Sequence, residues 1–287
     1  MEFILKNSYM CVTISSLGAQ LIKLVDKDNV SRLHDPSPIS WNEVSPILFP
    51  MISRFPDKKY KYNHQEYSIG THGFARFKEF KLIEFKEDLV TLLLEEDEQS
   101  LTQYPFRFNL FVTYRLEENV LSVEFKVVNA DEKLMYFMLG GHPGFKVPLY
   151  ENEKYDDYYL KFEKKETVEK TKLNGNYLSN MTEPFLHNQD IINLKYKMFN
   201  PDAFVMKNLK SKYIDLLSKN HQKGIRFYFQ EFKTLAIWST LHVDAPFVCL
   251  EPWNGLIQNF VEDLEEMKVL ELNPNQTFEC KYQIEVF

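Results

Sequence analysis

A carboxylate and two imidazoles stand out in this sequence because glycine, proline or tryptophan surrounds each of them. His142 lies in the segment GGHPGF, His72 in GTHGFARF and Glu251 in FVCLEPWNG. Glycine belongs where the backbone adopts a positive φ, or where another group comes close to the main chain. We therefore predict that a ligand lies near these side chains, and that the glycines around His142 leave room for it.

The residue types at these positions favour proton transfer. A histidine titrates near neutral pH, and apolar neighbours raise the pKa of a carboxyl group, so the two can act together as general acid and general base. Glu251 follows an apolar strand and precedes a Pro-Trp pair. The alternative for each residue is a structural role, as a histidine in a turn or a solvated glutamate at the end of a strand. Arg54 and Arg76 have a similar alternative, which is a surface ion pair.

Motifs for other chemistries are missing from the sequence. The histidines lack zinc-ligand spacing, and neither a G-x-S-x-G segment nor a glycine-rich phosphate loop occurs. The three cysteines, Cys11, Cys249 and Cys280, are far apart and lack C-x-x-C spacing, which indicates reduced thiols. The net charge of −7, without a basic stripe, argues against a nucleic-acid partner.

An apolar–polar alternation with a period of two dominates the chain. It predicts a hairpin over residues 110–127, a strand over 89–97, and strands that begin near residues 223, 234, 246 and 277. Turns are expected at Asn174-Gly175 and Pro274-Asn275, and a short helix or turn from residue 260. Many short strands without helices between them predict an all-β sandwich or barrel, with residues 1–287 as a single domain.

Nothing in the sequence directs the chain to a membrane. The first residues lack a basic segment followed by a long apolar one, and no apolar run approaches the length of a membrane span. We therefore expect a cytoplasmic protein without a membrane partner.

The motifs in the order R…HGFAR…GGHPGF…DAF…CLEPW resemble the aldose 1-epimerase (galactose mutarotase) family, in particular its LacX-like branch. The similarity runs from SSLGAQL near residue 15 to the last predicted strand. The resemblance implies a large antiparallel β-sandwich, the galactose mutarotase-like supersandwich, with few short helices and the sugar in an open cleft across one sheet. It also implies the interconversion of the α and β anomers of a free hexose, without a cofactor or a metal.

The resemblance implies a role for each matching residue. Glu251 corresponds to the base that takes a proton from the C1 hydroxyl, and His142 to the acid that gives one to the ring oxygen. His72 and Arg54 correspond to residues that bind the sugar, and Asp202, in the segment PDAF, to the substrate-binding aspartate.

The identity of the sugar does not follow from these motifs, because GGHPGF differs from the Asn-His-Ser sequence of the galactose enzymes. HGFAR also occurs in relatives that act on hexose 6-phosphates, so Arg54 and Arg76 could hold a phosphate. Two alternatives therefore stay open, a hexose-6-phosphate mutarotase and a non-catalytic carbohydrate-binding protein. By residue type alone, Trp253 and Trp238 are candidates for lining the cleft. In each case we expect a small-molecule sugar as the partner, and a monomer or homodimer.

Overall fold

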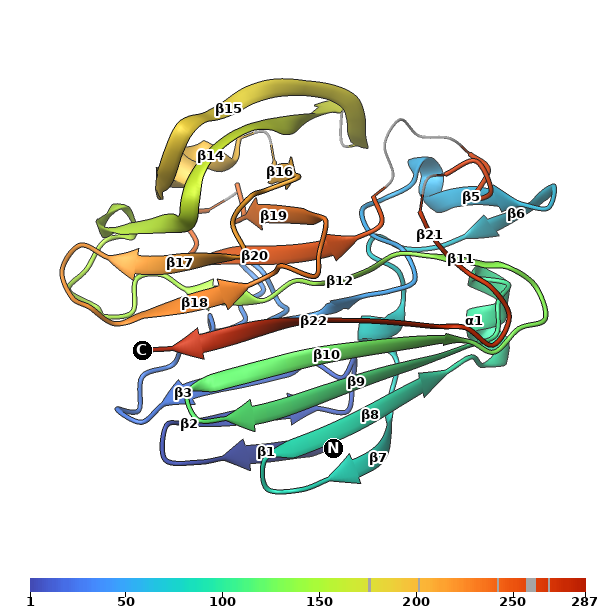
Figure 1. Ribbon diagram of the computed structural model, residues 1–287, viewed down its shortest axis with the longest axis horizontal. Coiled ribbons are helices and arrows are strands. Elements are labelled where there is room, and N and C mark those ends of the chain that lie inside the picture. Colours follow the sequence, from blue (N-terminus) through green and yellow to red (C-terminus); the bar gives the residue numbers. More distant parts are fainter. Residues whose placement is uncertain (175–176, 201, 242, 257–261, 268) are drawn as a thin grey trace.

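The computed structural model describes residues 1–174, 177–200, 202–241, 243–256, 262–267 and 269–287 (Figure 1). Antiparallel strands make up most of its regular structure, so the fold is all-β, as predicted. The helical elements in these residues are short: α1 (Glu98–Gln103) and the 3-10 helices η1 (Pro56–Lys58), η2 (Ala75–Phe77), η3 (Tyr155–Asp157) and η4 (Tyr196–Phe199). No helix in this part of the chain is long and apolar enough to cross a membrane.

Most strands belong to one antiparallel sheet of 15 strands. Its order is β4 (Ile47–Leu48), β12 (Leu139–Gly141), β20 (Phe247–Asn254), β19 (Thr234–Trp238), β16 (Phe204–Lys207), β14 (Tyr158–Asn174), β17 (Tyr213–Ser218), β18 (Gly224–Tyr228), β22 (Thr277–Val286), β10 (Val120–Asn129), β9 (Phe108–Glu117), β8 (Leu89–Glu95) and β7 (Lys81–Phe85). In addition, β13 (Gly144–Lys146) pairs with β20, and β15 (Tyr177–Asn193) pairs with β14.

Smaller sheets complete the molecule. They are a three-stranded sheet of β1 (Glu2–Lys6), β2 (Met10–Ser15) and β3 (Leu21–Asp26), and the pairs β5 (Lys59–Tyr62) with β6 (Gln65–Ser68) and β11 (Met135–Phe137) with β21 (Leu270–Leu272). Strands β1–β3 lie behind β7–β10 in Figure 1 and form the second layer of a sandwich. Across these layers, the buried Tyr114 hydroxyl donates a hydrogen bond of 2.7 Å to the carbonyl of Ala19.

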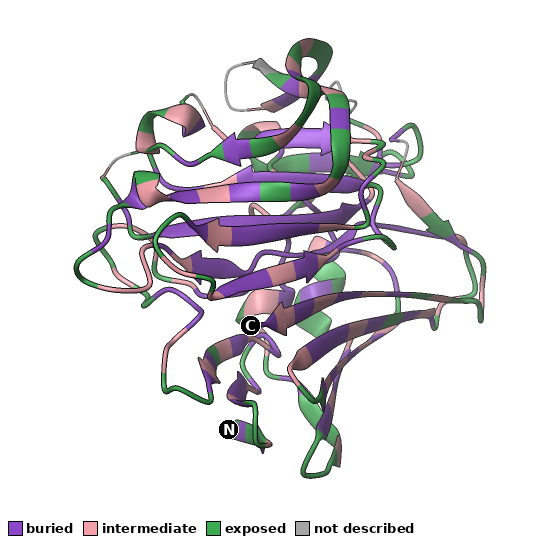
Figure 2. Ribbon diagram, turned by 60° about the vertical axis from the view of Figure 1, so that its left-hand side comes forward, coloured by how far each residue is buried: buried purple, intermediate pink, exposed green. Residues whose placement is uncertain are grey.

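The β9–β10 hairpin shows why the sequence folds in this way. Phe108, Leu110, Val112 and Tyr114 alternate along β9 and are fully buried, whereas the residues between them are partly exposed. Side chains of a strand alternate between its two faces, so the period of two in the sequence becomes one buried and one wet face. Figure 2 shows the same contrast, with buried strands in the middle of the large sheet and exposed loops around it.

Most of the predicted elements are confirmed. The strands expected at 89, 110, 121, 223, 234, 246 and 277 are β8, β9, β10, β18, β19, β20 and β22, and a turn is present at Pro274-Asn275. The expected helix or turn from residue 260 lies partly outside the described residues, and 264–266 form a turn. Gly175, in the other expected turn, also lies outside them. The sequence did not predict α1 or the long β14–β15 hairpin.

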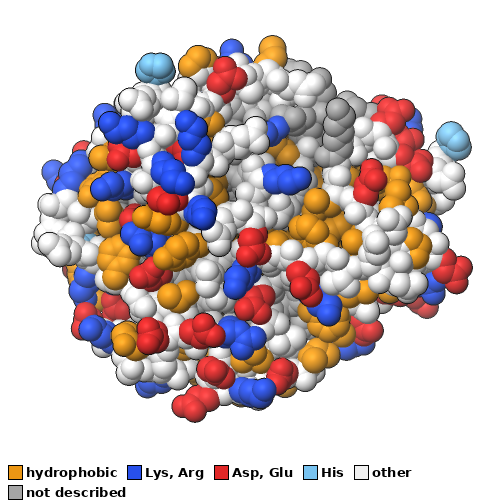
Figure 3. Space-filling view, viewed as in Figure 1, with side chains coloured by type: hydrophobic (Ala, Val, Ile, Leu, Met, Phe, Trp, Pro, Cys, Tyr) orange, Lys and Arg blue, Asp and Glu red, His pale blue; other side chains and the backbone are white. Residues whose placement is uncertain are grey.

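The order of the large sheet matters most for function. Strands β4, β12, β20, β19 and β16 are successive neighbours, although they come from widely separated parts of the chain between residues 47 and 254. Side chains that are far apart in the sequence therefore meet on one face at this end of the sheet. On the molecular face seen in Figure 3, acidic and basic side chains are interspersed rather than gathered into one large basic field.

Candidate active site

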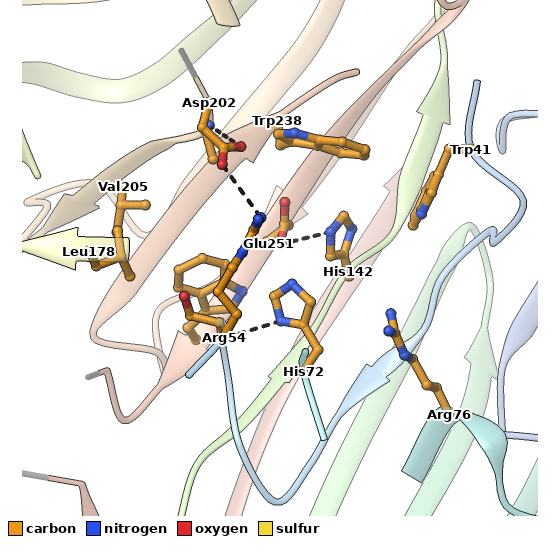
Figure 4. A pocket seen from close by; sticks show the side chains of 13 residues that line it. Trp41, Arg54, His72, Arg76, His142, Leu178, Asp202, Val205, Trp238 and Glu251 are labelled. Carbon is orange, nitrogen blue, oxygen red and sulfur yellow. Dashed lines mark hydrogen bonds and ion pairs between the residues drawn. The ribbon is translucent and has the colours of Figure 1, made fainter. Parts of the chain in front are cut away.

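A cavity of about 180 Å³ opens over this end of the large sheet (Figure 4). All of the residues that the sequence marked as site residues line it: Glu251, His142, Arg54, His72, Asp202 and Trp253. The other residues that line it are Trp41, Ser53, Arg76, Leu178, Ala203, Val205 and Trp238. The structure thus brings the predicted residues together in one place.

Strand β20 forms the floor of the cavity. All eight of its residues are buried, and alternation along the strand places Glu251 and Trp253 on the same face. Trp238 reaches that face from the adjacent β19, because the register pairs it with Cys249, two residues before Glu251. Glu251 is only 2% exposed, so its carboxyl group is largely withdrawn from water.

His142 directly contacts Glu251. Its Nε2 lies 3.1 Å from Oε2 of the carboxyl group, and the histidine is itself only 7% exposed. The ring lies between Trp41, at 4.8 Å between centroids, and Trp238, at 5.6 Å and nearly perpendicular. A nitrogen and an oxygen approach this closely only when a proton lies between them, because two lone pairs repel. The Glu251–His142 pair is therefore placed to share a proton across this contact.

Burial shifts the pKa values of both partners toward their uncharged forms. Burial, and secondarily the charge of Asp202, raises the pKa of Glu251 well above its usual range. Burial also lowers the pKa of His142 well below its usual range, with a smaller contribution from His72. Moving the shared proton from one partner to the other leaves the net charge of the pair unchanged. This arrangement is suited to a coupled acid and base.

His72 is held as a neutral imidazole with a defined tautomer. The backbone N–H of Ser53 donates to its Nδ1 at 3.2 Å, and the N–H of His72 donates to the carbonyl of Ser53 at 2.9 Å. Burial, helped by the charges of Arg76 and Arg54, lowers its pKa to about 3. Because Nδ1 accepts a hydrogen bond, the proton of the neutral ring resides on Nε2. His72 is thus prepared to donate a hydrogen bond.

The loop around His72 needs glycine at one position. His72 has a φ of 62° and Gly73 one of 73°, both in the left-handed region. A Cβ at Gly73 would lie 2.2 Å from the carbonyl oxygen of Phe49, so only glycine fits there. The close approach at this glycine comes from the backbone of Phe49 and not from a ligand.

Arg54 and Asp202 lie on the more exposed side of the cavity. The Nη2 of Arg54 is 3.7 Å from Oδ2 of Asp202, and the two side chains are 42% and 27% exposed. Figure 4 shows the guanidinium of Arg54 next to Glu251 and directed toward Asp202. A loose, partly hydrated ion pair of this kind contributes little to stability. Its donors and acceptors can therefore exchange partners with an entering polar ligand.

Trp41 is the site residue that sequence reasoning missed most clearly. It packs against His142, stands edge-on to Trp238 at 5.7 Å, and stacks on His34 at 5.0 Å. A signal was present in the composition, because the chain has only three tryptophans and all of them line this cavity. Their aromatic rings give the cavity apolar surfaces on which a flat apolar face of a ligand can stack.

The prediction that glycines around His142 leave room for a ligand is wrong for Gly141. A Cβ at Gly141 would lie 2.6 Å from the ring of Tyr282, a buried residue of the core. At Gly140 it would meet Trp253, and at Gly144 it would meet Trp41 at 2.7 Å. These glycines therefore admit other side chains of the protein: Tyr282 on the core side, and two tryptophans on the cavity side.

Comparison with known proteins identifies the family to which the chain belongs. The sequence model of the family described as aldose 1-epimerase matches residues 1–269, so the chain belongs to the aldose 1-epimerase family. The plasmid-encoded protein LacX of Lactococcus lactis subsp. lactis is 38% identical over 282 residues, which cover 95% of this chain and 93% of LacX. Its chromosomal counterpart is 37% identical over the same length.

Solved structures confirm the galactose mutarotase-like fold. A galactose mutarotase related enzyme from Lactobacillus acidophilus superimposes with a TM-score of 0.95 at 27% identity, covering 100% of this chain and 97% of that one. A galactose mutarotase-like protein from Lactobacillus casei ATCC 334 gives a TM-score of 0.94 at 28% identity, with both chains fully covered. The predicted fold and family are both confirmed.

Proposed function

We propose that this protein is an aldose mutarotase, which interconverts the α and β anomers of a free hexose of the galactose or glucose type. The observation that carries the proposal is the Glu251–His142 contact of 3.1 Å on the floor of a cavity walled by tryptophans. Anomerisation requires the removal of a proton from one sugar oxygen and the delivery of a proton to another. A buried pair that shares a single proton supports both transfers.

In the proposed reaction, Glu251 accepts the proton of the C1 hydroxyl while His142 donates a proton to the ring oxygen. The C1–O5 bond breaks and the C1–O1 bond becomes a carbonyl. Rotation about the C1–C2 bond presents the other face of this carbonyl, and the C5 hydroxyl attacks it. The two proton transfers then run in reverse, which regenerates the protein unchanged. General acid–base catalysis of this kind typically contributes about 10²–10⁴-fold to the rate.

Four further residues would bind the sugar. His72 would donate a hydrogen bond from Nε2 to a ring or hydroxyl oxygen, and Trp253 would stack on the apolar face of the ring. Arg54 and Asp202 would exchange their loose ion pair for hydrogen bonds to hydroxyl groups. Among the described residues, no cluster of three or more His, Cys, Asp or Glu side chains could hold a metal ion.

A second candidate is a mutarotase for hexose 6-phosphates. It is favoured by one observation, that Arg54 and Arg76 both line the cavity. A third candidate, a carbohydrate-binding protein without catalysis, is disfavoured by the Glu251–His142 pair, because binding alone does not require a base and an acid in contact.

The test is anomer exchange followed by polarimetry or NMR. Purified protein is added to freshly dissolved α-D-glucose, α-D-galactose and α-D-glucose 6-phosphate. The proposal expects accelerated exchange of a free hexose. Acceleration confined to glucose 6-phosphate would favour the second candidate. A folded protein that binds sugar and accelerates none of them would support the third.

A further inference from the structure

Arg76 is bound to a carboxylate that none of the sequence motifs marks. Its Nη1 donates to Oε2 of Glu43 at 2.8 Å, and its Nη2 donates to the carbonyl of Thr71 at 3.1 Å. The side chains of Arg76 and Glu43 are only 14% and 26% exposed, so water screens this ion pair weakly. Figure 4 shows Arg76 directed toward the space between His72 and Trp41.

The backbone holds Glu43 in place on both sides. Its carbonyl contacts Nε2 of His34 at 2.5 Å. The N–H of the next residue, Val44, donates to Oε1 of Gln20 at 2.9 Å, and the carbonyl of Val44 accepts from the N–H of Gly144 at 2.8 Å. The Glu43 carboxylate is therefore part of a fixed wall next to Arg76.

Each arginine of the cavity thus faces a carboxylate. Arg76 is paired with Glu43, and Arg54 lies 3.7 Å from Asp202. The pKa shifts of Glu251 and His142 both favour the uncharged forms, so this buried contact offers a phosphate no cation to bind. A phosphate dianion that enters this cavity meets the carboxylate of Asp202 on its wall, and the guanidinium of Arg76 is already bound to Glu43 behind it. An uncharged sugar is not repelled by a carboxylate and does not need a free guanidinium. An unfavourable charge placed against one ligand is a common means of specificity.

We propose that Glu43 is a specificity-determining residue, which holds Arg76 in an ion pair and thereby makes the cavity select uncharged sugars over sugar phosphates. This inference rests on the proposed mutarotase function and adds to it the residue that separates the two substrate classes. It also assigns Arg76 a positioning role, because its bond to the carbonyl of Thr71 fixes the residue that precedes His72.

The test is the variant Glu43→Gln, which keeps the shape of the side chain and removes its charge. The kcat/KM for anomer exchange is measured with α-D-glucose and with α-D-glucose 6-phosphate. The ratio of the phosphate value to the glucose value should rise about tenfold or more over wild type, since a hydrogen bond from a charged donor is released for the phosphate. Inorganic phosphate should also inhibit the variant at lower concentration than it inhibits wild type.

Two further variants separate specificity from general damage. Glu95→Gln removes a carboxylate of the exposed Lys81–Glu95 pair in β8, away from the cavity, and should leave the ratio unchanged. The double variant Glu43→Gln/Arg76→Met removes the released cation, so the ratio should return toward the wild-type value. A variant that is merely destabilised loses activity on both substrates alike and leaves the ratio unchanged.

The outcomes separate this inference from the function on which it rests. If wild type accelerates no sugar, the proposed function fails. If wild type accelerates glucose but Glu43→Gln leaves both the ratio and the inhibition by phosphate unchanged, the inference alone is overturned. A wild-type protein that prefers glucose 6-phosphate also overturns it. Should Glu43→Gln fail to fold, Glu43→Asp takes its place, and it should keep the wild-type preference because it keeps the charge.

Discussion

At the scale of single residues, the central feature of the site is a buried acid–base pair, Glu251 and His142, whose charged forms are stabilised by each other rather than by water. Glu251 and His142 are both almost fully buried, and burial shifts the pKa of each toward its uncharged form. In contact, they can exist as acid and imidazole or as carboxylate and imidazolium, with the same number of protons. In the second form the pair is the base and acid that the proposed ring opening needs.

The lowered pKa of His72 predicts how the stability of the protein depends on pH. Its pKa is lowered from 6.5 to about 3 in the folded protein, so the unfolded chain binds a proton first as the pH falls. The stabilisation is present above about pH 6.5 and is lost toward pH 3. As the pH falls from 6.5 to 4.5, this residue should lower the free energy of unfolding by about 1–2 kcal/mol, after a discount for the partial exposure of its side chain.

The measurement is urea unfolding of wild type and His72→Gln at pH 7, 5.5 and 4.5. The free energy of unfolding should fall less steeply with decreasing pH in the variant, because glutamine does not titrate. Parallel curves for the two proteins would show that His72 takes up its proton equally well in the folded state.

Some of these residues could be predicted from the sequence, and others could not. Glu251, His142 and His72 stand in segments whose glycine, proline and tryptophan content is visible without a structure. Trp41 is one of only three tryptophans, but no histidine or glycine near it in the sequence marks it as a site residue, and the role of Glu43 depends on which residues the fold places beside it. The partner of Arg76 lies 33 residues earlier in the chain, a pairing that no local pattern reveals.

At the scale of elements, strand β12 and the start of β13 determine how closely the layers approach around His142. Gly141 lies against the ring of Tyr282 from β22, and Gly144 lies against Trp41 and His34. The glycines near His142 thus belong to packing between elements. The sequence showed that close approach occurs here, but it did not show which group approaches.

Gly141→Ala should therefore destabilise the protein, while the folded variant keeps its turnover. The added Cβ would lie 2.6 Å from the Tyr282 ring, and overpacking of a core costs about 1–3 kcal/mol. Gly70→Ala is the matched control, because a Cβ there has no neighbour within 4 Å. Urea unfolding should show the loss for Gly141→Ala only. A variant of wild-type stability that has lost turnover would instead restore the original prediction of room for the ligand.

The β14–β15 hairpin and helix α1 could not be predicted from the sequence, for physical reasons. In β14–β15 the register shifts several times, between Lys161 and Glu166 and again between Glu166 and Glu169, so alternation is interrupted along the strands. Helix α1 has only six residues and is stabilised by a capping box between Asp97 and Ser100. Such a helix is too short to show a hydrophobic period.

At the scale of the whole molecule, the C-terminal strand β22 joins the two parts of the large sheet. It pairs with β18 on the side that leads to the cavity and with β10 on the side that leads to β7. Ile284 is fully buried in this strand, opposite Leu121 of β10 and Phe227 of β18. We therefore expect the chain to unfold as one cooperative unit, in keeping with the prediction of a single domain over residues 1–287.

Ile284→Ala tests this expectation. Removal of a buried isoleucine side chain costs about 2–5 kcal/mol. Tryptophan fluorescence reports on the cavity, where all three tryptophans lie, whereas far-UV circular dichroism reports on the strands of the whole molecule. Both urea transitions should coincide in wild type and shift together in the variant. Separate midpoints for the two signals would show that the halves unfold independently.

The most direct test of the account is the turnover of Glu251→Gln with the hexose that wild type converts fastest. We predict that the rate of anomer exchange falls by about 10²-fold or more, while the affinity for the sugar changes little, because glutamine keeps the shape but cannot accept the proton. Glu153→Gln, which changes a comparable buried carboxylate 3.3 Å from His221 and outside the cavity, should keep its turnover. A Glu251→Gln protein that exchanges anomers at the wild-type rate would contradict the proposal that this carboxylate is the base.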